Sequence, residues 1–102
     1  MNKLVRDGKV AVLYSPTFGA GWYTWNGDTP EILFDPAIVQ LVLEEKFDEL
    51  ETFVELKYPK IFKGGMMDLE VKWITEGTLF KVVEYDGAES IEYKEDNEWI
   101  IA

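Results

Sequence analysis

The chain has 102 residues, 47% of them hydrophobic and 15% aromatic, which is enough to build the core of one folded domain. It contains neither cysteine nor histidine, which argues against disulfides, thiol chemistry, histidine-based catalysis and zinc sites. The net charge of -10, from 20 acidic and 10 basic residues, disfavours nucleic acid and anionic membranes as partners. We therefore expect one domain over residues 1–102, with no cofactor and no metal.

The first part of the chain predicts a strand, a loop and a helix. Residues 9–14 are apolar enough for a largely buried strand, and a loop follows over residues 15–29. Residues 31–34 fit either a short strand or the approach to a helix. Asp35-Pro36 predicts a helix start, because Asp caps the first N–H groups and Pro suits the first turn. The helix either continues to Lys57 or breaks near Lys46, before Pro59 ends it.

Apolar residues keep a helical spacing in this segment, and acidic residues occupy most of the remaining surface. The apolar set is Ile38, Leu41, Val42, Leu43, Phe47, Leu50 and Val54, and the acidic set is Glu44, Glu45, Asp48, Glu49, Glu51 and Glu55.

Beyond a loop over residues 60–65, the spacing changes to an alternation of two residues, typical of strands. Strands are predicted from residue 69 to 74, from 79 to 85 and from 88 to 93, with turns at Glu76-Gly77 and Asp86-Gly87. A further turn over residues 94–97 leads to a terminal strand at 99–101. The order predicts an α+β fold, in which an antiparallel β-meander packs against one long or broken helix.

The loop is the first candidate binding site, because residues 15–27 contain four aromatic residues, three glycines and a proline. Glycines let backbone N–H groups approach a phosphate, and flat rings stack on a base. The candidate ligand-binding residues here are Ser15, Phe18, Gly19, Ala20, Gly21, Trp22, Tyr23 and Trp25. The same residues also fit a compact loop with its rings in the core, or an oligomer interface.

Basic residues are scarce, so three of them join the candidate site. Arg6 is the only arginine, and Lys60 and Lys63 lie beside Gly64-Gly65 in a second loop. Each side chain is suited to binding a phosphate, and each is equally suited to forming an ordinary ion pair on the surface.

The other polar residues point less clearly to chemistry. The acidic residues show no calcium-loop spacing, and the serines have no histidine partner, so we expect no enzyme. The hairpin tip over residues 84–90 either lines a site through Glu89 and Ser90 or is simply a turn.

Two segments, 12–22 and 76–90, together resemble a group of small, mostly uncharacterised proteins of tailed bacteriophages and prophages. The resemblance extends over nearly the whole chain, including Asp35-Pro36 and the Trp99-Ile100 ending. Small phage proteins of this kind often counteract host defence, in some cases by sequestering a nucleotide immune signal as homo-oligomers. The resemblance implies no catalytic residues.

Two functional hypotheses follow from these observations. The first is a non-enzymatic, homo-oligomeric binder of a nucleotide-type small molecule, of the cyclic ADP-ribose or cyclic oligonucleotide class, acting in the host cytoplasm. The second is an acidic inhibitor that binds a host nuclease or another nucleic-acid-binding defence protein, as the charge suggests. A structural virion component is a third possibility. No apolar segment marks a signal peptide or a membrane span, which predicts an intracellular protein.

Overall fold

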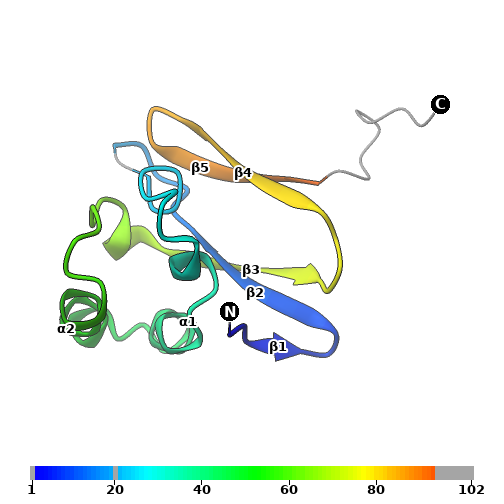
Figure 1. Ribbon diagram of the computed structural model, residues 1–102, viewed down its shortest axis with the longest axis horizontal. Helices are drawn as coiled ribbons and strands as arrows, with labels where there is room; N and C mark the ends of the chain where they lie inside the picture. The colour runs from blue at the N-terminus through cyan, green and yellow to red at the C-terminus, as the bar shows by residue number, and fades with distance from the viewer. Residues whose placement is uncertain (1, 20, 94–102) are drawn as a thin grey trace.

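A computed structural model describes residues 2–19 and 21–93 of the chain and has an α+β fold, as predicted. The elements are β1 (Val5–Arg6), β2 (Lys9–Tyr14), the 3-10 helix η1 (Pro30–Leu33), α1 (Pro36–Leu43), α2 (Phe47–Lys57), the 3-10 helix η2 (Met66–Asp68), β3 (Glu70–Thr75), β4 (Phe80–Tyr85) and β5 (Ala88–Tyr93). The helices lie on one side of the β2–β3 strands, and the β4–β5 hairpin lies on the other (Figure 1).

Strand β2 is the centre of the molecule because it is buried on both faces. It pairs antiparallel with β1 on one edge and with β3 on the other, where Ala11 lies opposite Trp73. Ala11 and Leu13 belong to the core cluster under the helices, whereas Val10 and Val12 belong to the cluster under the hairpin. A strand covered on both faces needs a continuous apolar run, which explains the sequence of residues 10–13.

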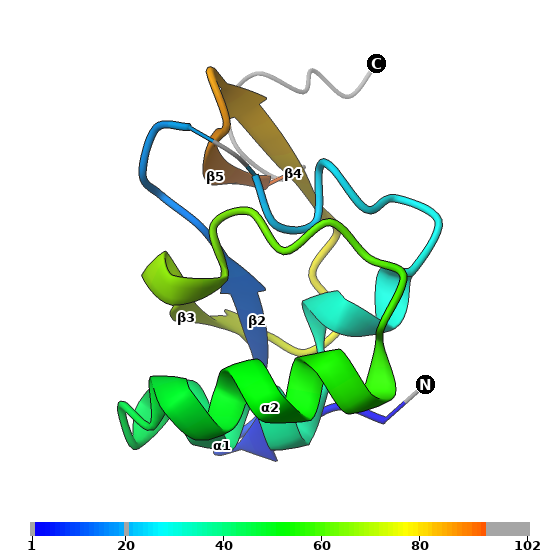
Figure 2. The ribbon, with the colours of Figure 1, turned by 90° about the vertical axis from the view of Figure 1, so that its left-hand side faces the viewer.

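The predicted helix is broken in two. Asp35 caps α1 by accepting a hydrogen bond from the N–H of Ala37 at 2.9 Å, with Pro36 in the first turn. The chain leaves α1 at Glu44, and Glu45 adopts a left-handed backbone with φ of 57° before α2 begins. This reversal packs α2 against α1, so the two helices are seen next to each other in Figure 1, and α2 lies in front of α1 in Figure 2.

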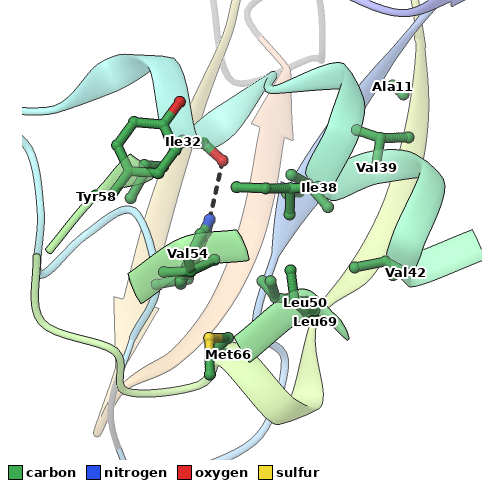
Figure 3. Packing of buried hydrophobic residues seen from close by; sticks show 12 residues of the cluster. Ala11, Ile32, Ile38, Val39, Val42, Leu50, Val54, Tyr58, Met66 and Leu69 are labelled. Carbon is green, nitrogen blue, oxygen red and sulfur yellow. Dashed lines mark hydrogen bonds between the residues drawn. The ribbon is translucent and has the colours of Figure 1, made fainter. Parts of the chain in front are cut away.

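The main core cluster fills the space between the helices, β2 and the loops. Ile38, Val39 and Leu50 are fully buried in it (Figure 3). Burial of each such side chain contributes about 1.5–3 kcal/mol to the free energy of folding. The packing of the helices on β2 therefore provides much of the hydrophobic stabilisation.

The C-terminal strands are divided between two sheets. Strand β3 pairs with β2, whereas β4 and β5 form a separate two-stranded antiparallel sheet. Asp86 and Gly87 connect β4 and β5 with φ of 50° and 84°, the backbone of a tight hairpin turn, as their sequence predicts. The predicted turn over 94–97 and the strand at 99–101 lie outside the described residues. No helix within the described residues is long and apolar enough to cross a membrane.

Candidate functional site

The loop over residues 15–29 is folded around the carboxylate of Glu89, which comes from β5. One carboxylate oxygen, Oε2, accepts hydrogen bonds from the N–H of Trp22 at 3.0 Å and from the N–H and hydroxyl of Thr24, both at 2.8 Å. The other oxygen, Oε1, accepts a bond from the N–H of Ser15 at 2.9 Å. Glu89 is only 3% exposed, so these four bonds replace the water that a carboxylate would otherwise bind.

Two backbone hydrogen bonds join the same hairpin to the loop. The N–H of Glu89 donates to the carbonyl of Ser15 at 2.7 Å, and the N–H of Gly19 donates to the carbonyl of Asp86 at 2.8 Å. The hairpin tip therefore holds both the start and the middle of the loop.

Trp22 is part of the core rather than of an accessible surface. Its ring is fully buried, and its indole N–H donates a hydrogen bond to the carbonyl of Ile32 at 3.0 Å, drawn as the dashed line in Figure 3. Ser15 is also fully buried, and its hydroxyl is the buried side-chain group without a hydrogen-bond partner among the described residues.

Gly21 is needed for close packing inside the loop. A Cβ atom at this position would lie 2.3 Å from the Thr24 hydroxyl oxygen and 2.7 Å from Trp25 Cδ1. The absence of a side chain at Gly21 therefore allows Thr24 and Trp25 to pack closely against the backbone, as the compact-loop alternative predicts.

These contacts correct the expectation of an open amide cradle formed by Ser15, Gly21 and Trp22. All three residues are buried, and the amides of Ser15 and Trp22 are bonded to Glu89. The physical reason is that a carboxylate of the protein itself satisfies the loop N–H groups. Ala20 lies outside the described residues.

The exposed rings of the loop are Phe18 and Trp25, which are 72% and 46% exposed. Phe18 contacts Tyr85 of the hairpin edge to face, with ring centroids 6.4 Å apart. Trp25 stacks on Phe62, with ring centroids 4.9 Å apart and an interplanar angle of 28°. Tyr23 is half-buried and packs against both core clusters.

The Trp25–Phe62 pair is held in place by Asn26. The side-chain oxygen of Asn26 accepts a hydrogen bond from the N–H of Phe62, and its NH₂ group donates to the carbonyl of Phe62, both at 2.7 Å. The two loops that carry the candidate residues are therefore joined, as a shared site requires.

The predicted basic residues are only partly brought together. Lys60 and Lys63 lie in the same loop as Phe62, two positions before it and one position after it in the sequence. Arg6 lies in β1, at the other end of β2 from the loop, where its guanidinium group lies over the Trp73 ring and donates to Gln40 at 3.3 Å. The structure does not place Arg6 beside the aromatic residues of the loop.

A second polar cluster links the start of α1 to the end of α2. The carboxylate of Asp35 accepts hydrogen bonds from the ammonium group of Lys57 at 2.8 Å and from the hydroxyl of Tyr58. Burial opposes ionisation, but these bonds and the Ala37 N–H outweigh it and lower the pKa of Asp35. Burial and the Asp35 carboxylate together raise the pKa of Tyr58. The cluster borders a cavity of about 270 Å³, and its bonds fix the two helix ends relative to each other.

The acidic residues of the helical segment all lie on the surface. The exposed set is Glu44, Glu45, Asp48, Glu49, Glu51 and Glu55. Within the described part of the chain, no three acidic side chains gather closely enough to hold a metal ion.

Sequence reasoning missed Phe62 and Asn26, and it left the role of Glu89 open. The alternation of β5 places Glu89 on the same strand face as Ile91 and Tyr93, which pack on a core cluster. An acidic residue on an apolar strand face is the signal for a buried, partnered carboxylate. The pairing of Asn26 with Phe62 has no comparable signal, because the two residues are 36 positions apart.

No protein-family model, curated protein or solved structure matches this chain.

Proposed function

We propose that the protein is a non-enzymatic binder of the phage type, which sequesters a nucleotide-derived host immune signal in the host cytoplasm and so counteracts antiviral defence. The ligand class is that of cyclic ADP-ribose derivatives or cyclic oligonucleotides. The observation that carries the proposal is the exposed Trp25–Phe62 pair on a strongly acidic chain, with Lys60 and Lys63 within two positions of Phe62 in the sequence. The resemblance to phage proteins supplies the biological context.

The Trp25–Phe62 pair suits a nucleobase for two reasons. Stacking of a base on an aromatic side chain contributes about 1–3 kcal/mol, and half of the surface of Phe62 is exposed, at 50%. Asn26 fixes the backbone of Phe62, so little conformational entropy is lost when a ligand binds. The rings are thus already oriented before the ligand arrives.

In this proposal the phosphate groups are bound by Lys60 and Lys63 rather than by the loop amides. The amides of Ser15, Trp22 and Thr24 already bond to Glu89, and its negative charge would repel a phosphate there. Ammonium groups bind phosphates as point charges and need no fixed orientation.

Heat extraction is the direct test of sequestration. The purified protein is incubated with lysate from cells whose defence has been activated, then denatured, and the released small molecules are identified by mass spectrometry. Recovery of an intact nucleotide supports a binder without turnover. Recovery of a hydrolysed product would contradict it.

Calorimetry against a panel of cyclic nucleotides and ADP-ribose derivatives locates the site. Trp25→Ala should weaken binding about 5- to 150-fold, the loss of one stacking contact. Leu56→Ala is the control, because Leu56 is also a large exposed hydrophobic residue but lies in α2 and takes part in neither aromatic contact of the loop. Equal losses in both variants, or silence across the panel, would argue against this site.

The proposal includes a homo-oligomer, since proteins that sequester such signals commonly bind them near subunit interfaces. The exposed rings of Phe18 and Tyr85 provide apolar surface for such a contact. Light scattering after size-exclusion chromatography tests this point, and a monomer at all concentrations would refute it.

The acidic inhibitor is the second candidate function, and the exposure of the helical acidic residues favours it. It predicts strong salt dependence and competition with DNA for the target enzyme. Charge reversal at Glu44, Asp48 and Glu51 should abolish inhibition of a nuclease panel and should leave nucleotide binding unchanged. Inhibition that survives the reversal would rule out this mechanism.

A further inference from the structure

A shallow groove, widely open to solvent, lies on the helix layer between α1 and α2. It has a volume of about 510 Å³ and is lined by Leu41, Asp48, Glu49, Thr52 and Phe53. Leu41 and Phe53 are partly buried and pack against the main core cluster, so they supply a fixed apolar surface in the groove. The two helices lie side by side in Figure 1, and the groove shares no lining residue with the Trp25–Phe62 pair.

The polar residues of the groove are acidic or neutral. Asp48 and Glu49 are both exposed, and they lie in the first turn of α2. Thr52 completes the lining, and it contributes no charge. The groove therefore combines apolar contact area with two carboxylates at its edge.

Two lysines near the groove, Lys46 and Lys57, are paired with other carboxylates. The ammonium group of Lys46 lies 3.0 Å from a carboxylate oxygen of Glu44. The ammonium group of Lys57 lies over the Phe53 ring, 5.7 Å from its centre, and bonds to Asp35 at 2.8 Å. The charge that a partner would meet at this groove is consequently negative.

We propose that this groove binds a basic segment of a partner protein, which inserts one large apolar side chain against Leu41 and Phe53. Lysine or arginine side chains beside that anchor would then lie against Asp48 and Glu49. Charge complementarity selects this occupant. A phosphate would be repelled by the carboxylates, and a second copy of this chain, with 10 basic against 20 acidic residues, offers few cationic side chains to pair with them.

The inference rests on the second candidate function and gives it a point of contact. A nucleic-acid-binding enzyme has a basic surface, because phosphate neutralisation requires one. Binding in the groove also requires an apolar anchor residue in the partner, whereas a purely electrostatic contact does not. The groove hypothesis can therefore be refuted while the acidic-inhibitor hypothesis stands.

Three synthetic peptides test the proposal with the full-length protein. The probe is Lys-Lys-Trp-Lys-Lys, the second peptide has glycine in place of tryptophan, and the third has glutamate in place of every lysine. Binding is followed by NMR titration at physiological salt. The probe should shift the resonances of Leu41, Thr52 and Phe53, and each of the other peptides should bind about tenfold more weakly or worse.

A blocking variant separates the groove from general attraction. Thr52→Phe fills the groove without changing the charge and should weaken probe binding at least about fivefold. Thr75→Phe is the matched control, since Thr75 is also exposed but lies in β3, and it should bind the probe as the unaltered protein does.

Three outcomes would overturn the proposal. They are equal binding of the tryptophan and glycine peptides, equal effects of the two threonine substitutions, and shifts confined to residues outside the groove. Equal binding of the two lysine peptides would still leave the acidic inhibitor standing as a purely electrostatic one. Absence of binding by both would count against the inhibitor as well.

Discussion

Replacement of Glu89 tests how the loop over residues 15–29 is held. Oε2 of Glu89 accepts three hydrogen bonds and Oε1 accepts one, and all four donors belong to the loop. In Glu89→Gln only one acceptor oxygen remains. If it keeps the position of Oε2, the new NH₂ group points at the N–H of Ser15, and two donors face each other.

The magnitude follows from these bonds. A buried donor left without a partner costs about 1–3 kcal/mol, and the bonds that remain lose the strength that the charge gave them. We therefore expect Glu89→Gln to lower the free energy of unfolding by about 2–3 kcal/mol. Glu89→Ala removes all four bonds, and we expect it to cost about 4 kcal/mol or more, a large part of the stability of a domain of this size.

The assay is urea unfolding at neutral pH, followed by circular dichroism and tryptophan fluorescence. Hydrogen exchange at the amides of Ser15, Trp22 and Thr24 should accelerate in Glu89→Gln, which reports the loss of the bonds locally. Glu76→Gln is the matched control, because Glu76 is exposed in the turn before β4, and it should change stability by less than about 0.5 kcal/mol. A loss of stability in Glu89→Gln as small as that of the control would show that the Glu89 carboxylate does not hold the loop.

Three further predictions concern other positions. The pKa of Asp35 lies below its ordinary value of 3.8, so its contribution to stability is complete above about pH 4 and is lost as the pH falls through the folded-state pKa. Asp35→Asn should therefore lower the free energy of unfolding by about 1–3 kcal/mol at pH 7. The difference from the unaltered protein should become smaller in unfolding curves measured in acid. A difference independent of pH would contradict this. Gly21→Ala should cost about 1–3 kcal/mol in thermal unfolding because its Cβ would have no space, whereas Gly27→Ala, with nothing within 4 Å, should be close to neutral; equal effects would count against the packing described. Glu45→Gly should stabilise the protein by about 0.5–1 kcal/mol, since φ of 57° suits glycine, and a decrease in stability would show that the left-handed backbone is not strained.

Local features of the fold could be predicted from the sequence because each depends on neighbouring residues. The apolar run of β2, the Asp35 cap and the Asp86-Gly87 turn appear where they were predicted. The apolar spacing continues past Lys46, so the sequence does not decide whether the helix breaks there. Packing decides it, since the left-handed Glu45 turns α2 back against α1.

Pairings between distant residues could not be predicted. Strand β3 leaves the expected meander to pair with one edge of β2, and the helices and the β4–β5 hairpin cover the two faces of β2. The composition of the loop indicated aromatic rings and close backbone approach, but it did not show which rings face inward. Trp22 is buried and Trp25 is exposed, although the two residues are three positions apart in the same loop.

The fold class, most strand and turn positions and the acidic helical surface can be predicted from the sequence, because they follow from residue spacing and local backbone preference. The partner of the loop amides depends instead on how distant segments pack. A carboxylate 74 residues away from Ser15 reaches them, since a buried charge and buried N–H groups are each costly alone and are satisfied together.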